Sequence, residues 1–171
     1  TPNVRPGKKL PLNIRAFRQS DLDTILDIAV AAWQPVFESS REIVGEKLFG
    51  LIYTDSDARK REQVSGACHE DDPRQVWIAE LDNEIVGFII VHMYHDRKVA
   101  EIGNNAVSPA HQGHGVGAQM YVFVLERMRE AGMKAAIVTT GGDDAHAPAR
   151  RAYEKVGFSG AVPSLEYHIE L

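Results

Sequence analysis

Three glycines lie close together in the segment from Gln112 to Ala118, which reads Gln-Gly-His-Gly-Val-Gly-Ala. They directly precede the longest amphipathic stripe of the chain, in which apolar residues recur every three or four positions over residues 117–131. Glycines let the backbone turn so that successive N–H groups point the same way, and the start of a helix adds about half a positive charge. The segment therefore predicts a backbone site for phosphate at the start of a helix, which needs no basic side chain.

Spacing argues against two other kinds of phosphate loop. A P-loop requires Gly-Lys followed by Ser or Thr, whereas Gly117 is followed by Ala-Gln. A dinucleotide fingerprint is matched formally by Gly113, Gly115 and Ala118, but residues 108–112 separate the preceding strand from the first glycine, and no acidic residue ends the next strand. A P-loop is therefore excluded, and a dinucleotide-dependent oxidoreductase is a distant alternative.

The rest of the chain alternates between period-two and helical patterns, which indicates one mixed α/β unit. Expected strands cover residues 12–17, 75–81, 84–95, 99–107, 135–140 and 165–171. Expected helices cover residues 20–35, 41–53, 56–68, 116–132 and a last segment that ends at Gly157. Ser20 and Asp23 form a variant of a capping box, and Pro35 is expected to end or kink the first helix. Asp82 and Asn83 tolerate positive φ, so they predict a two-residue hairpin turn.

Composition limits the class of protein. A chain of 171 residues, 44% apolar and 25% charged, has the size of one globular domain, expected at 12–171, with residues 1–11 as a flexible N-terminal arm. The net charge of −5 argues against nucleic acid as a partner. The longest apolar run, residues 85–91, is too short to cross a membrane. The single cysteine, Cys68, cannot form an intrachain disulfide, which favours a reducing, cytoplasmic location.

Two motifs in this order resemble those of a known family. Val-Ser-Pro at 107–109, with Gln-x-x-Gly-x-Gly at 112–117, is similar to the pattern V-x-P-x-x-Q/R-x-x-G-x-G/A of the GNAT family of N-acetyltransferases. Residues 149–158 resemble the C-terminal signature of that family, and the hairpin at 85–88 resembles its second and third strands. The resemblance covers residues 12–171. It implies a mixed α/β (α+β) fold with a mostly antiparallel central sheet of six to seven strands, helices on both faces, and a splayed parallel strand pair that forms the acetyl-CoA cleft.

The resemblance implies acetyl-CoA as the cosubstrate. The family holds the pyrophosphate on backbone N–H groups of the glycine loop, which here are those of Gln112, Gly113, His114, Gly115, Val116, Gly117 and Ala118. The strand at Ala106 and Val107 would pair with the pantetheine arm, which carries amide groups. His146 stands seven residues before Tyr153, where the family often has Asn, so it is expected near the cofactor with an altered hydrogen bond.

Through the C-terminal signature, Tyr153 resembles the general acid of the family, and a phenol is protonated at neutral pH and can donate to a leaving thiolate. The alternative is a core residue on the helical stripe of Ala149 and Val156. Glu101, on the strand that leads to the cleft, matches the carboxylate that takes the amine proton through water in many members. The alternative for Glu101 is a solvated side chain at the strand edge.

The first helical region and the strand at 99–107 are expected to flank the acceptor amine. Candidate substrate-binding residues are Trp33, Phe37 and Asn104, and the helical spacing of Trp33 also fits ordinary core packing. Simple alternation places Glu101, Gly103 and Asn105 on one face of the strand and Ile102, Asn104 and Ala106 on the other.

The expected acceptor is a small-molecule amine or an amine of a peptide or protein, and the acidic balance favours a cationic one through steering. No metal is expected: His92 and His95 point to opposite faces of a strand, and His111 and His114 flank the loop with no third ligand nearby in the sequence. A homodimer through sheet edges or the last strand is a further hypothesis. The leading hypothesis is an acetyl-CoA-dependent N-acetyltransferase, and the alternative is a non-catalytic CoA-binding sensor or regulatory module.

Overall fold

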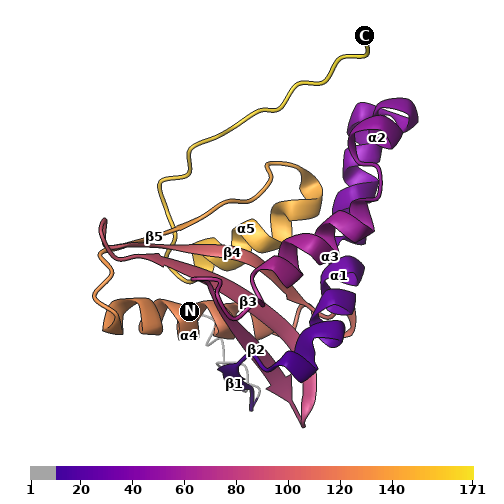
Figure 1. The fold of residues 1–171 in the computed structure, drawn as a ribbon. Coiled ribbons are helices and arrows are strands. Elements are labelled where there is room, and N and C mark those ends of the chain that lie inside the picture. Colours follow the sequence, from indigo (N-terminus) through magenta and orange to yellow (C-terminus); the bar gives the residue numbers. More distant parts are fainter. Residues whose placement is uncertain (1–10) are drawn as a thin grey trace, which may run out of the picture.

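The computed structural model describes residues 11–171. Within this range the helices are α1 (Leu22–Val44), α2 (Glu46–Ile52), α3 (Ser56–Gly66), α4 (Val116–Glu130) and α5 (Ala147–Lys155), with short 3-10 turns at Gln19–Asp21, Pro109–His111 and Asp144–His146. The strands are β1 (Asn13–Ala16), β2 (Gln75–Leu81), β3 (Glu84–Tyr94), β4 (Val99–Val107) and β5 (Ala135–Val138). They form one sheet in the order β1-β2-β3-β4-β5, antiparallel except for the parallel pair of β4 and β5 (Figure 1).

Helices cover both faces of this sheet (Figure 1). On one face α1 and α3 place Ile25 and Val64 in a fully buried cluster with Phe88. On the other face α4 and α5 place Met120 and Tyr153 in a second cluster. β3 is buried on both faces, which is why it reads as a nearly continuous apolar run. None of the helices among the described residues is long and apolar enough to cross a membrane.

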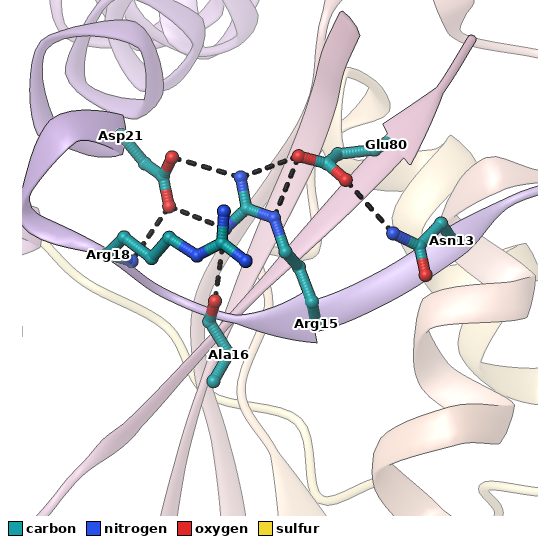
Figure 2. Close-up of polar contacts among 6 residues, drawn as sticks. All are labelled: Asn13, Arg15, Ala16, Arg18, Asp21 and Glu80. Carbon is teal, nitrogen blue, oxygen red and sulfur yellow. Dashed lines mark hydrogen bonds and ion pairs between the residues drawn. The ribbon is translucent and has the colours of Figure 1, made fainter. Parts of the chain in front are cut away.

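An ion-pair cluster joins β1 to the start of α1 and to β2 (Figure 2). The Arg15 guanidinium donates to both carboxylate oxygens of Asp21, at 2.7 and 3.0 Å, and its Nε donates to Glu80 at 2.7 Å. Asp21 also accepts a 2.8 Å bond from the backbone N–H of Arg18. The bond from Arg15 holds the pKa of the Asp21 carboxyl below its usual range, against the opposing effect of burial. Asp21, and not the Ser-x-x-Asp box expected at 20–23, closes the turn before α1.

The hairpin and most of the expected elements are confirmed. Asp82 and Asn83 connect β2 to β3 with φ angles of 51° and 66°, as a hairpin turn with two positive-φ residues requires. The strands expected at 75–81 and 99–107 have the expected ends, and the helix expected from residue 116 begins there. These segments share strong local signals, because turn residues or glycines stand directly at their ends.

The first helices differ from the expectation at two points. Pro35 does not end a helix but lies inside α1, so a kink, the other expected effect, stays a prediction. Ala31, whose carbonyl loses its helical partner to the proline, is exposed, so water can replace that bond. The helix expected at 41–53 is divided at Gly45, whose φ of 84° and ψ of 157° lie outside the helical region. Its first four residues belong to α1, and most of the rest form α2.

The closing strand expected at 165–171 is absent, so the sheet over residues 11–171 has five strands instead of six to seven. After α5 the chain runs away from β5 toward α2 (Figure 1). There Glu170 pairs with Lys47, and the His168 ring lies 6.4 Å from the Tyr53 ring. These contacts place the segment beside α2 and not beside β5.

Candidate active site

The parallel strands β4 and β5 diverge, as expected. They pair from Val99 opposite Ala135 to Ile102 opposite Val138, and no further. β4 continues to Val107, while the chain after β5 turns away through residues 139–142 toward α5. The last five residues of β4, Gly103 to Val107, therefore have a hydrogen-bonding edge that β5 does not cover. This is the edge at which a ligand with amide groups could add to the sheet.

A β-bulge in β4 changes which side chains face each other, and it corrects the simple alternation. Val91 of β3 pairs with Ile102, but Ile89 pairs with Asn105, so β4 contains one extra residue at this point. As a result Ile102 and Asn105 both face α4, while Asn104 faces α3. Glu101 lies between Ala100 and Ile102, both packed toward α4, so its side chain is on the opposite face with Asn104.

The glycine loop has the conformation that an anion site requires. Gly113 and Gly115 have φ angles of 78° and 83°, and the space beside both is open. The Gln112 side chain closes the loop by donating to the Val107 carbonyl at 3.0 Å. The first bond of α4 in the described chain is from Gln119 to Gly115, so the N–H groups of residues 116–118 have no helical acceptor. With no acidic residue in the first turn of α4, the loop fits the diphosphate of a nucleotide-type cosubstrate.

Tyr153 is held at the open part of β4 by Asn105. The Asn105 Nδ2 donates to the Tyr153 hydroxyl at 3.2 Å, and the Asn105 Oδ1 accepts from the Tyr121 hydroxyl at 2.8 Å. The rings of Tyr121 and Tyr153 lie 4.8 Å apart, and both residues are buried. Burial raises the pKa of Tyr121 well above its usual range, and the adjacent Tyr153 adds to this effect. Tyr153 is thus both a core residue and the end of a polar network.

Glu101 lies on the opposite face of β4 and has one side-chain partner among the described residues. Its carboxylate accepts a 2.9 Å hydrogen bond from the Tyr94 hydroxyl. This bond raises the pKa of Tyr94, because the nearby carboxylate disfavours a phenolate. Tyr94 in turn packs on the His92 ring at 4.1 Å and below the Arg97 guanidinium at 4.4 Å. Glu101 is half-buried, so both a proton-transfer role and a solvated surface role fit its position.

Trp33 lies between a buried lysine and His146. The Lys60 Nζ stands 3.3 Å from the centroid of the Trp33 ring, and the His146 ring meets the same indole edge-on at 6.0 Å. Lys60 is only 5% exposed and donates to Asn104 at 3.1 Å and to Gln63 at 2.9 Å. Burial without a carboxylate partner among the described residues lowers the pKa of Lys60 to about 8. Of the three expected substrate-binding residues, Trp33 and Asn104 thus come together around Lys60.

Phe37, the third expected substrate-binding residue, lies one helical turn further along α1. Its ring is 6.3 Å from that of Trp33, and it also lines a cavity of about 570 Å³ between α1, α2 and α3. Phe37 therefore connects the surroundings of Trp33 with this cavity. None of the residues that line the cavity belongs to the glycine loop, so the cavity and the loop are two separate parts of the surface.

His146 is fixed by the loop between β5 and α5. Its Nδ1 contacts the Asp143 carboxylate, which also accepts a 2.8 Å bond from Ser39 of α1. Burial acts to raise the pKa of the Asp143 carboxyl, but the bonds from His146 and Ser39 outweigh it, so that the pKa is lowered. The Arg150 guanidinium donates to the carbonyl oxygens of Gly141 and Asp143, both at 2.6 Å. The loop is therefore tied both to α1 and to α5.

The sequence analysis missed Lys60 and Tyr121 as members of these clusters. Lys60 lies four residues before Val64, so both are on the buried face of α3, but the helix is otherwise polar and gave no reason to examine that face. Tyr121 lies on the apolar stripe of α4, where a hydroxyl on a buried face is itself a signal of a buried partner. For Asn105 the sequence predicted only a place on the same strand face as Glu101.

Comparison with known proteins agrees with the fold. Residues 26–158 match the model of the acetyltransferase (GNAT) family. A mycothiol acetyltransferase from Sanguibacter keddieii is 29% identical over 97% of this chain and 50% of its own length, and one from Thermomonospora curvata is 31% identical over 56% of this chain and 31% of its own. The chain thus spans half or less of these curated relatives.

Solved structures carry the same fold. A GNAT family acetyltransferase from Brucella melitensis, in complex with acetyl-CoA, has a TM-score of 0.62 and 21% identity over 87% of this chain and 83% of its own. With the family match covering more than half of its residues, the chain belongs to the GNAT acetyltransferase family.

Proposed function

We propose that this protein is an acetyl-CoA-dependent N-acetyltransferase that moves an acetyl group from a thioester to an amine by direct attack. The observation that supports this most is the position of the buried Tyr153 hydroxyl, at the part of β4 that β5 leaves uncovered. The glycine loop at the start of α4 follows the same strand after the short turn of residues 108–112. The uncovered end of β4 therefore has a proton donor, an open strand edge and an anion site close to it. A transfer reaction from a thioester on a nucleotide-bearing carrier requires these three features close together.

The loop and β4 would hold the cosubstrate. Residues Gln112 to Ala118 would bind its diphosphate through backbone N–H groups, and the free edge at Ala106 and Val107 would pair with its pantetheine amides. His146 would lie alongside, fixed by Asp143. Acetyl-CoA, when bound, supplies the thioester whose acetyl group is transferred.

Two side chains would move protons. Tyr153 would donate the proton of its hydroxyl to the sulfur as the C–S bond breaks. Glu101, directly or through a water molecule, would accept the proton that the amine loses as the C–N bond forms. Because Glu101 and Asn104 share one face of β4, the amine would approach from the side of α1 and α3, where Trp33 and Lys60 lie.

A cationic amine is the acceptor class that this surface favours. The cavity of about 570 Å³ that begins at Phe37 is lined by aromatic rings and by four carboxylates, with one arginine. The carboxylates belong to Glu38, Glu46, Asp55 and Asp57. Such a wall attracts a second ammonium group of an extended amine and repels anionic acceptors. The curated relatives are named for mycothiol, so an amine of that type belongs in a test panel with polyamines, aminoglycosides, amino acids and a peptide N-terminus.

A thermal-shift titration with acetyl-CoA, CoA and NADH tests the cosubstrate. Saturation at about 100 times the dissociation constant stabilises a protein by about 2.7 kcal/mol, which raises Tm by about 5–10 °C for a chain of this size. We expect this rise with both CoA species and not with NADH. A rise with NADH alone would support the dinucleotide alternative, and no rise with CoA would contradict the proposal.

Thiol release from acetyl-CoA against the amine panel tests the reaction. Tyr153→Phe should lower kcat by about 100-fold or more at saturating acetyl-CoA, because general acid catalysis contributes about 10²–10⁴-fold. It should leave CoA affinity unchanged. Tyr167→Phe is the matched control, because this tyrosine is 87% exposed. Binding of CoA without turnover of any amine would favour the non-catalytic CoA-binding module.

A further inference from the structure

We propose that Asn105, oriented by Tyr121, is a positioning residue that keeps the proton of Tyr153 available to the leaving thiolate and stabilises the phenolate that forms. This inference rests on the proposed role of Tyr153 as general acid. It goes beyond that role because it assigns two further residues, one on β4 and one on α4, to the same proton transfer.

The orientation of the Asn105 amide follows from its three partners. Nδ2 lies 3.0 Å from the backbone carbonyl of Gly103, and a carbonyl oxygen only accepts hydrogen bonds. The nitrogen must therefore be on that side, and Oδ1 must face Tyr121, whose hydroxyl lies 2.8 Å away. An amide nitrogen has two hydrogens, and the second is directed to the Tyr153 oxygen at 3.2 Å. Both N–H groups of the amide thus have an acceptor, and its oxygen has a donor.

This arrangement decides what the Tyr153 hydroxyl can do. Its oxygen accepts from Asn105, so its own proton is not used in that bond and can be donated into the opening between β4 and β5. After the proton has left, the same N–H group donates to a phenolate, and hydrogen bonds to charged acceptors are about twice as strong as neutral ones. The bond from Asn105 therefore strengthens during proton transfer, which is the condition for lowering the barrier.

Tyr121 keeps the network in this state. It is 5% exposed, and burial raises the pKa of its phenol, so it remains a proton donor to Asn105 over the whole range in which the enzyme would be assayed. If Tyr121 ionised, its phenolate would attract the Nδ2 hydrogens and turn the amide away from Tyr153. The bulge in β4 is equally necessary, because the extra residue is what turns Asn105 toward α4.

The test replaces Asn105 and changes the leaving group. Asn105→Leu, of similar size and without the donor, should lower kcat with acetyl-CoA by about 10- to 100-fold, the value of a hydrogen bond to a charged group, with little change in KM. With 4-nitrophenyl acetate as donor, whose nitrophenolate leaves without a proton, the loss should be absent. Release of the CoA thiol is followed with acetyl-CoA as donor, and release of nitrophenolate is followed with 4-nitrophenyl acetate. Both assays use the best amine of the panel as acceptor, or water if no amine reacts. An equal loss with both donors, or no loss, would overturn the inference.

A double-mutant cycle gives an independent readout. Asn105→Leu should cost nothing further in a Tyr153→Phe background, because both changes disable one proton transfer. Additive losses would show that Asn105 acts elsewhere. Tyr121→Phe should give a smaller loss than Asn105→Leu, because Gly103 still orients the amide. If Tyr153→Phe retains full kcat, the acid assignment itself fails; if it loses kcat while Asn105→Leu does not, only this inference fails.

Discussion

Replacing Arg15 with methionine tests how much the buried ion-pair cluster stabilises the fold. The change keeps much of the aliphatic stem but removes the guanidinium that lies between Asp21 and Glu80 (Figure 2). Asp21 is 4% exposed and would remain charged, with the Arg18 N–H as its one hydrogen-bond partner among residues 11–171. Removing one partner of a buried pair costs about 3–5 kcal/mol, and the 17% exposure of the other two side chains favours the lower end. A loss of about 3 kcal/mol lowers Tm by about 6–12 °C for a chain of this size.

The pH dependence supplies the more specific part of this prediction. Hydrogen bonding to Arg15 lowers the pKa of Asp21 in the folded protein, so the pair stabilises the fold above the ordinary Asp range and is lost as pH falls through the folded pKa. In Arg15→Met the Asp21 carboxylate is buried without the guanidinium. Protonation of this carboxylate at low pH removes the cost of burying its charge and so reduces the loss of stability in the variant. The difference in unfolding free energy between the two proteins should therefore be largest at pH 7 and shrink toward about pH 4.

Urea unfolding at pH 7 and pH 4 measures both effects, with the slope m unchanged if the transition stays two-state. Arg61→Met is the matched control, because Arg61 and its partner Asp27 are 43% and 71% exposed. An exposed pair contributes about 0–1 kcal/mol. The reasoning would be refuted by equal losses in the two variants, or by a loss in Arg15→Met that is the same at both pH values.

Three further predictions concern the site and the surface. Gly115→Val, at φ 83°, should strain the loop and weaken CoA binding about tenfold or more. Gly132→Val, at φ 80° after α4, should lower stability but leave CoA binding unchanged. Isothermal titration of CoA into both variants distinguishes the two effects. Gly141→Ala would place a Cβ against the His146 ring and should raise the KM for acetyl-CoA several-fold. Gly142→Ala is the control, because the space beside Gly142 is open, and it should leave this KM unchanged. Equal effects of the two variants would contradict the prediction. The exposed apolar residues of 165–171 and the edge of β5, which no other described strand covers, predict a homodimer in light scattering that Tyr167→Asp dissociates. A monomer at every concentration would contradict this.

Local signals in the sequence were sufficient for the elements that determine the cosubstrate side of the site. Gly113 and Gly115 mark where the backbone takes positive φ, and the apolar stripe after them marks where α4 begins. The pair Asp82 and Asn83 marks the hairpin in the same way. Each of these features depends on neighbours within a few residues, so one sequence carries the whole signal.

The acceptor side depended on contacts between distant segments. The bulge that turns Asn105 toward α4 is defined only by pairing with β3, so alternation along β4 alone gave the wrong faces. Lys60 becomes part of the site because α3 packs beside Trp33 and Asn104, which are 27 and 44 positions away. The alternating segment 165–171 has a strand pattern, but it lies beside α2 and not beside β5.

What the sequence determined by itself is therefore the family motifs, the glycine loop and the order of most helices and strands, because these follow from local backbone preferences and from the period of apolar residues. Only the tertiary structure decided how Tyr153, Asn105 and Tyr121 share one set of hydrogen bonds, and on which face of β4 Glu101 lies. Hydrogen-bond partners in a core depend on which strands pair and in what register, and that is settled by the packing of the whole domain.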